Sequence, residues 1–331
     1  MTFSRRFTPH RSLPGRLLIF SALALCICLL PQSGAAQEER PATCVSSDLA
    51  RLIVTEGKGV RVLAAEAASR DGGGRENTKG TQVVREAKSS RELAEARKWF
   101  EKGARKGFPA AQVNLAVAAF AGWGGEANAG TALYWLTAAA EQHYAPAYFD
   151  LGVLYFKGCG VRQDYQQAFQ YFAAGAKEGD LGAQVNLAYF YNNGLGTKKD
   201  DAAAATWYRR AAEGGDARAQ FFLADMILRG EGVAQDDAAA FAWFEKSARQ
   251  GHTLARLMLG AMYAAGRGVA KDVQAAYMWM SAAELQGEPR ARALLAPLEK
   301  QLMPVQIAEA KERAKSLEST ARPIGEVAAL H

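Results

Sequence analysis

Hydrophobic residues along most of the chain recur at the spacing of paired amphipathic helices. Between residues 147 and 157, Ala147, Leu151 and Tyr155 fall on one helical face. After a short turn, Ala168 and Phe172 begin a second stretch with the same spacing. The pattern predicts a helix–turn–helix unit, whose two helices are called helix A and helix B below.

This unit recurs with a period of 36 residues. One hairpin cannot bury its own apolar face, whereas a stack of hairpins covers each face with the next unit. The sequence therefore predicts an all-α solenoid of stacked helix–turn–helix repeats. The columns that keep the 36-residue step include Ala111, Ala147, Ala183, Ala219, Ala255 and Ala291; Leu115, Leu151, Leu187, Leu223, Leu259 and Leu295; and Trp99, Trp135, Tyr171, Trp207, Trp243 and Trp279.

The turn between the two helices has its own chemistry. Gly158 follows the last turn of helix A, where a left-handed residue is favoured, and Gly160 permits a second unusual backbone angle. Asp164 stands where helix B needs an N-cap. We expect the same roles in the other units, at Gly122/Gly124, Gly194/Gly196, Gly230/Gly232 and Gly266/Gly268, and at Asn128, Asp200, Asp236 and Asp272.

With its Gly-x-Gly-Val turn and 36-residue period, the segment from Ala147 to Ala168 resembles the Sel-one-like repeat, a longer relative of the tetratricopeptide repeat. The resemblance covers about residues 91–300 and implies a right-handed superhelix with a concave surface lined mainly by the A helices. It also implies an adaptor or regulatory role, often in bacterial envelopes. The family does not share one molecular activity.

The ends of the array depart from the repeat. We expect residues 37–90 to form an N-terminal extension with a degenerate repeat or an irregular segment, and with a flexible glycine-rich linker around Gly72–Gly80. Residues 91–288 hold a half repeat and five full units. Residues 289–318 form a further half repeat and a capping helix from Pro304, and residues 319–331 a flexible tail.

The first 36 residues have the pattern of a secretory signal peptide. Four arginines precede an apolar run from Leu17 to Leu30, and Ser33–Ala36 supplies small residues for cleavage after Ala36. We therefore expect export to the periplasm of a Gram-negative bacterium, or secretion, without a membrane span after cleavage; an uncleaved anchor is the alternative. Without this segment the net charge falls from +6 to +2, which gives no support for a nucleic-acid partner.

Few residues suggest chemistry. The chain beyond Ala36 has two cysteines, Cys44 and Cys159, which either form a disulfide in an oxidising compartment or stay as separate thiols. His143 and His252 fall in turns between units and are interpreted as surface residues rather than ligands. No catalytic, metal or cofactor motif is present, so we predict a protein that is not an enzyme and needs no cofactor. The tryptophan column is interpreted as core packing.

Binding residues are expected where columns change residue type within a fixed framework. Three such columns share one stripe of helix A, which we expect to line the concave groove and to hold an extended peptide or a helix of a partner. The polar side chains could hold a peptide backbone, and Phe222 and Met258 an apolar anchor. The alternative is a solvated face with two apolar residues packed between units. The stripe residues are Asn114, Asp150, Lys157, Asn186, Tyr189, Asn193, Phe222, Asp225, Arg229 and Met258.

These features favour an exported scaffold that binds a protein or peptide, as an adaptor or regulator in the cell envelope. A hydrolase of cell-wall or β-lactam-type substrates is an alternative, because some cysteine-rich relatives of the repeat are associated with such activity. Those relatives carry a cysteine pair in each unit, whereas this array holds only Cys159. A membrane-tethered assembly factor is a third class, if the signal is not cleaved.

Overall fold

The computed structural model describes residues 73–320, and every regular element within that range is an α-helix. The expected signal peptide, Cys44, residues 37–72 and the last 11 residues lie outside the described range. The helices are α3 (Gly74–Glu86), α4 (Ser90–Arg105), α5 (Pro109–Phe120), α6 (Ala129–Ala140), α7 (Ala145–Lys157), α8 (Tyr165–Lys177), α9 (Leu181–Asn193), α10 (Asp201–Glu213), α11 (Ala217–Arg229), α12 (Asp237–Arg249), α13 (Thr253–Ala265), α14 (Val273–Leu285), α15 (Ala291–Glu299) and α16 (Pro304–Thr320).

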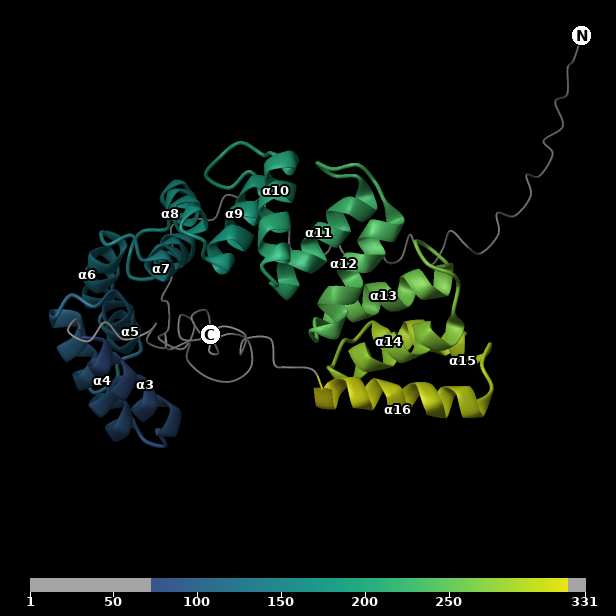
Figure 1. Ribbon diagram of the computed structural model, residues 1–331, viewed down its shortest axis with the longest axis horizontal. Coiled ribbons are helices and arrows are strands. Elements are labelled where there is room, and N and C mark those ends of the chain that lie inside the picture. Colours follow the sequence, from purple (N-terminus) through teal and green to yellow (C-terminus); the bar gives the residue numbers. More distant parts are fainter. Residues whose placement is uncertain (1–72, 321–331) are drawn as a thin grey trace, which may run out of the picture. The chain divides into compact units, whose positions relative to one another are not determined.

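From α3 to α15 each helix packs against the next helix in the chain, and α16 packs on α14 (Figure 1). The odd-numbered helices from α5 to α13 are the predicted A helices, and the even-numbered helices from α6 to α14 are the B helices. The prediction of an all-α solenoid of helix pairs is therefore confirmed.

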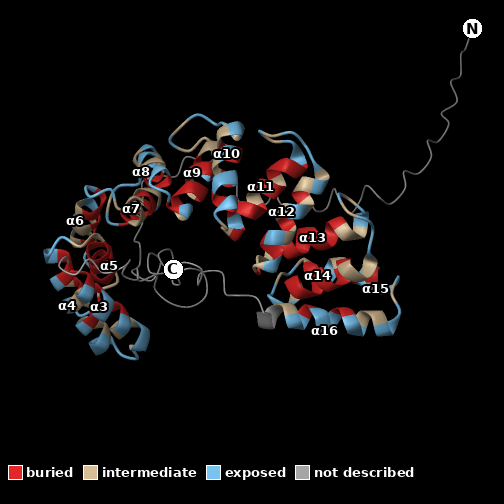
Figure 2. Cartoon of the chain, viewed as in Figure 1, coloured by how far each residue is buried: buried red, intermediate tan, exposed pale blue. Residues whose placement is uncertain are grey.

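The core consists of the repeated columns. The six leucines of the Leu115 column are each at most 3% exposed, and the six alanines of the Ala111 column are fully buried. In Figure 2 the buried residues, coloured red, lie mainly on the sides of the helices that face other helices. Removing apolar side chains of this kind from water is the main stabilising contribution in such an array.

Small residues set how closely the helices approach. A Cβ added at Gly152 of α7 would lie 2.6 Å from the ring of Phe172 on α8. At the corresponding position of α13, a Cβ on Gly260 would lie 2.7 Å from Met280 on α14. The small residue after the leucine thus makes room for the large side chain of its own helix B.

The turn chemistry is as predicted. Gly158 and Gly160 have φ angles of 73° and 72°, and Gly158 is the left-handed cap of α7. The Asp164 carboxylate accepts hydrogen bonds from the backbone N–H groups of Gln166 and Gln167, both at 2.9 Å. Side chains at the corresponding positions cap the other B helices: Asn128, Asp200, Asp236 and Asp272.

A buried polar column joins successive units. Gln184 and Gln220, near the starts of α9 and α11, donate from Nε2 to the carbonyls of Ala176 and Ala212 in the preceding helix B, at 3.3 and 3.1 Å. Arg256 takes this place in α13 and donates from Nε to the Ala248 carbonyl at 3.1 Å. Burial lowers the pKa of Arg256 to about 10. The carbonyls lie in the last turns of the B helices, where each also accepts a bond from a glycine N–H of the following turn, so the side chains add a second bond that ties each unit to the next.

The N-terminal end differs from expectation, because Gly74–Glu86 form helix α3 where we expected a flexible glycine-rich linker. Gly80 occupies the column of Gly152, and a Cβ there would collide with the ring of Phe100 on α4. The Nδ2 of Asn114 on α5 donates to Oδ1 of the buried Asn77 at 2.8 Å. Helix α3 is therefore the A helix of a degenerate unit whose helix B is α4.

The C-terminal end contains the expected half repeat, α15, and the expected capping helix, α16. Ala310 and Ala314 of α16 are fully buried and Ile307 is partly buried, as the predicted apolar stripe requires. Helix α16 packs on α14 (Figure 1), and most of its other described side chains are exposed (Figure 2). The helix continues to Thr320, into the segment that we expected to be a flexible tail.

The aromatic column of helix B is less buried than predicted. Trp279 is 4% exposed, but Trp99, Trp135, Trp207 and Trp243 are only half-buried. In several units a cation covers the open ring face, for example Lys246 Nζ at 4.0 Å from the ring centre of Trp243. The fully buried aromatic position is the following one, at Phe100, Phe172 and Phe244.

Candidate functional site

The predicted stripe lies on the A helices α5 to α13, and its members differ in exposure. Asn114, Asp150 and Met258 are 1%, 6% and 7% exposed. Asn186 and Phe222 are partly buried, whereas Tyr189 is 38% exposed. A partner could therefore reach the stripe most easily on α9 and α11. We call this part the α9–α11 surface; it comprises Asn186, Tyr189, Asn193, Phe222, Asp225 and Arg229.

On α9, two asparagines face the surface as hydrogen-bond acceptors. The Nδ2 of Asn186 donates to the Gly182 carbonyl, and the Nδ2 of Asn193 donates to the Tyr189 carbonyl, both at 2.8 Å. With a donor of each amide used inside the helix, the side-chain oxygen is the group left to accept from a ligand. Seven residues of helix separate the two asparagines by about 10 Å, roughly three residues of an extended chain.

On α11, an aromatic side chain and an ion pair complete the surface. The Phe222 ring stacks on Tyr208 of α10 with centres 5.2 Å apart. The Asp225 carboxylate pairs with Arg229 at 3.2 Å, and Arg229 also lies 3.8 Å from Glu231. Burial raises the pKa of Asp225, while Arg229 opposes that shift. The pair fixes the Arg229 guanidinium at one end of the surface.

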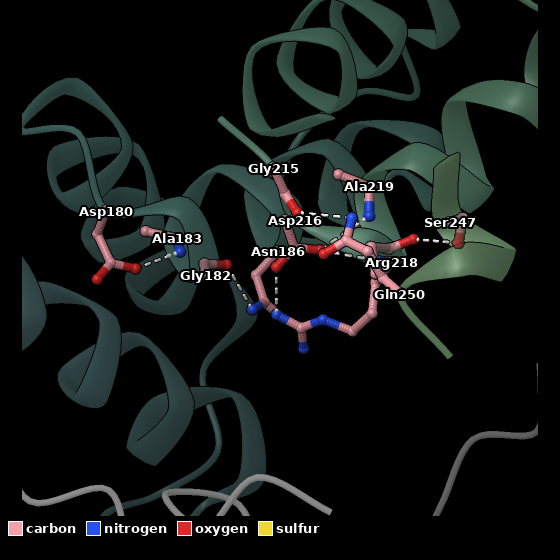
Figure 3. A network of polar contacts seen from close by, with 11 residues as sticks. Asp180, Gly182, Ala183, Asn186, Gly215, Asp216, Arg218, Ala219, Ser247 and Gln250 are labelled. Carbon is pink, nitrogen blue, oxygen red and sulfur yellow. Dashed lines mark hydrogen bonds and ion pairs between the residues drawn. The ribbon is translucent and has the colours of Figure 1, made fainter. Parts of the chain in front are cut away.

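Two residues that the sequence analysis did not select border the same surface. Burial raises the pKa of the Tyr208 phenol, and Tyr189, Arg218 and Asp225 are the groups whose charges act on it. Arg218 extends from the start of α11 toward Asn186 of α9, and its Nη2 pairs with Asp216 at 3.2 Å (Figure 3). The sequence did contain a signal for Arg218. It is a charged residue in a repeat column where other units have Ala110, Pro146, Gly182 and Leu254.

The other residues singled out in the sequence, Lys157 and the two cysteines, do not belong to the α9–α11 surface. Lys157 is exposed on α7, with its Nζ 5.0 Å from the centre of the Phe156 ring. Cys159 is fully buried and disulfide-bonded. Because Cys44 lies outside the described residues, the Cys44–Cys159 pairing stays a prediction. Residues 73–320 contain no cluster of three or more His, Cys, Asp or Glu side chains that could hold a metal ion.

The two histidines occupy different positions in the turn between units. His143 is exposed, as predicted, and lies 3.4 Å from Glu178. His252 is partly buried instead, and its Nδ1 accepts a hydrogen bond from the Ala255 N–H as the N-cap of α13. Equivalent positions in the two preceding units hold Asp180 and Asp216, which cap α9 and α11.

A family model described as "Sel1 repeat" matches residues 89–108, 109–144, 145–180, 182–216, 217–252 and 253–288. The chain belongs to the Sel1 repeat family. The last five matches coincide with the helix pairs α5/α6 to α13/α14, and the first covers α4. Sel1 repeat proteins generally act as scaffolds for protein–protein interactions.

Solved structures of other Sel1 repeat proteins agree with this assignment. A Sel1 repeat protein from Oxalobacter formigenes is 30% identical, with a TM-score of 0.56 over 66% of this chain and 87% of that one. The protein c5321, a protective antigen of uropathogenic Escherichia coli strains with an SLR fold, is 27% identical, with a TM-score of 0.58 over 75% of this chain. The chain spans 61% of the length of c5321. A comparison with curated proteins finds no match.

Among residues 73–320, no helix is both long and apolar enough to cross a membrane.

Proposed function

We propose that this Sel1 repeat protein is an exported adaptor or regulator of the bacterial cell envelope that binds an extended segment of a partner protein on the α9–α11 surface. The observation that carries the proposal is the change in exposure along the stripe. Two of the three columns, those that begin at Asn114 and Val117, are buried on α5, α7 and α13 but are more exposed on α9 and α11. Here they expose amide oxygens, a tyrosine and a half-buried phenylalanine.

The chemistry of this surface suits a peptide better than a small charged ligand. Its charged side chains are already paired, because Arg229 binds Asp225 and Arg218 binds Asp216. The two asparagine oxygens of α9 can accept hydrogen bonds from backbone N–H groups of an extended segment. Phe222 and Tyr189 offer aromatic area beside them for one apolar side chain of the partner.

Site-specific crosslinking tests the surface. A photoreactive amino acid at position 189 is expected to capture a defined partner from living cells, and peptide mapping would locate one segment of it. The matched control is position 134, because Tyr134 is also exposed (65%) but lies on α6, away from the α9–α11 surface. Equal adducts at both positions would contradict specific binding at α9–α11.

Substitution then measures the contribution of the surface. Asn186→Ala and Tyr189→Ala are each expected to weaken binding of the captured segment about tenfold, since each removes a group that contacts it. Tyr134→Ala should leave binding unchanged. Full affinity in both α9 variants would exclude the proposed surface while leaving the fold unaffected.

Export is tested by the mass and location of the native protein. We expect a periplasmic chain that begins at Gln37, because cleavage is predicted after Ala36. An intact N-terminus in the membrane fraction would instead indicate a membrane-tethered assembly factor.

A further inference from the structure

His252 occupies a structural position where its charge state matters. It is the N-cap of α13, and its Nδ1 accepts the hydrogen bond of the Ala255 N–H at 3.2 Å. Only an unprotonated nitrogen can accept this bond. At the equivalent position α9 and α11 are capped by the aspartates Asp180 and Asp216, whereas the acceptor here is an imidazole, the side chain whose ordinary pKa lies closest to neutral pH.

The imidazole ring also begins a chain of aromatic contacts. It stacks on Phe221 of α11 with centres 4.7 Å apart and planes at 25°. Phe221 contacts its neighbour Phe222 at 5.4 Å, and Phe222 stacks on Tyr208 at 5.2 Å. The cap of α13 is thus in contact, through one buried ring, with the aromatic side chain of the α9–α11 surface.

The charged groups around His252 come from each helix packed near it. On α11, the charge of Asp216 favours protonation and that of Arg218 opposes it. On α12, Arg249 is exposed and paired with Glu245; on α13, the Arg256 guanidinium is bonded to the carbonyls of Ala248 and Ala282. On α14, the end nearest this turn contributes the neutral Gln286, which bonds to Thr253. Burial is the dominant influence and lowers the pKa of His252 to about 4.

We propose that acidification releases the His252 cap and loosens the contact of α13 with α11, so that the α9–α11 surface loses its ordered aromatic wall and its partner at acidic pH. The coupling to a partner rests on the function proposed above. The protonated ring loses the Ala255 hydrogen bond and places a positive charge at a helix N-terminus, where the helix dipole disfavours it. It also brings that charge into a partly buried position against Phe221.

The pH range follows from proton linkage. In the closed state His252 resists protonation down to about pH 4, whereas a released histidine titrates near pH 6.5. The ratio of open to closed molecules therefore rises as pH falls between these values, by about 20-fold between pH 7 and pH 5.

Hydrogen exchange of the full chain at pH 7 and pH 5, corrected for intrinsic rates, tests the switch. Peptides covering α11 and the first turn of α13 are expected to lose protection about 20-fold in the wild type. In His252→Asn the loss should disappear, because asparagine caps without titrating, as Asn128 does on α6. His252→Asp serves as a second capping variant, and α5 serves as an internal reference.

The outcomes separate the switch from the proposed function. A loss of protection confined to the wild type supports the switch, even if nothing is captured at position 189, which would overturn the partner proposal alone. An equal loss in the wild type and both capping variants overturns the switch, even if a partner is captured. Where a partner is captured, unchanged capture by the wild type at pH 5 overturns the coupling.

Discussion

At the scale of single residues, His143 has a backbone conformation that favours glycine but carries a side chain. It has a φ angle of 57°, the only positive value at a non-glycine position in residues 73–320. The equivalent positions in other units are Gly107, Gly179, Gly215, Gly251 and Gly287, all with positive φ. A non-glycine residue in this conformation destabilises the folded state by about 1–2 kcal/mol. Replacing it with glycine restores only part of this free energy, because glycine also raises the conformational entropy of the unfolded chain.

We therefore expect His143→Gly to raise the free energy of unfolding by about 0.5–1 kcal/mol, measured by urea denaturation. The exposed ion pair with Glu178 that is lost contributes little. The reverse exchange at the equivalent position, Gly179→His, should lower stability by about 1 kcal/mol. A lower urea midpoint for His143→Gly would mean that the pair with Glu178 outweighs the backbone strain.

The second glycine of the Gly-x-Gly turn is required by close packing as well as by its φ angle. Gly232 has a φ angle of 68°, and a Cβ there would collide with the carbonyl oxygen of Asp201 at the start of the preceding helix B. Gly215 also has positive φ but nothing within 4 Å of an added Cβ. Gly232→Ala should therefore cost about 1–3 kcal/mol more than Gly215→Ala in thermal or urea unfolding. Equal costs would show that only the φ angle matters.

Several of these residue roles could be predicted from the sequence, and others could not. The capping aspartates and the left-handed glycines follow from short-range rules, so the 36-residue columns identified them. The role of His252 was missed because its neighbour Phe221 lies 31 positions earlier in the chain. The border residues Tyr208 and Arg218 were missed for a similar reason: the surface forms only when three helices pack together.

At the scale of elements, α3 shows why a terminal repeat is difficult to recognise. In inner units the Ala111 column packs on the preceding helix B; a Cβ on Gly175 of α8, for example, would touch Ala183. Helix α3 has Arg75 in this column, but it keeps Gly80, which faces its own helix B. Helix α3 therefore lacks the small residue that packs on a preceding helix B and keeps only the one that faces its own helix B. The glycine-rich sequence at its start resembles a linker, so the sequence pattern alone did not identify the helix.

The cap of α13 makes the stability of one element depend on pH. Its folded pKa of about 4 lies below the free value of 6.5, so the unfolded chain binds more protons between these pH values. The stabilisation is complete above about pH 6.5 and is lost as pH falls toward 4. Relative to His252→Asn, wild-type stability should decrease by about 2 kcal/mol from pH 7 to pH 5. Parallel pH curves for the two proteins in urea titrations would contradict this expectation.

At the scale of the whole array, stability comes from contacts between neighbouring units, and each end must expose a polar face. Helix α14 is more buried than the other B helices: Tyr277, Met278, Trp279 and Met280 are each at most 6% exposed. Helix α16 packs on it, with Gln274 Nε2 of α14 donating to Glu309 at 3.0 Å. The polar outer side of α16 thus replaces the apolar side that an inner unit would present.

Displacing α16 should therefore change how the protein associates as well as how stable it is. Ala310 is fully buried on the inner side of α16, whereas Ala308, two residues away, is exposed. Ala310→Arg is expected to lower the free energy of unfolding by at least about 2 kcal/mol, because a charged side chain enters a packed interface. The apolar face of α14 that is uncovered should promote self-association, measured by light scattering. Ala308→Arg should change neither property. If Ala310→Arg destabilised the protein without any association, α16 would contribute only packing energy, and the apolar face of α14 would not need a cap.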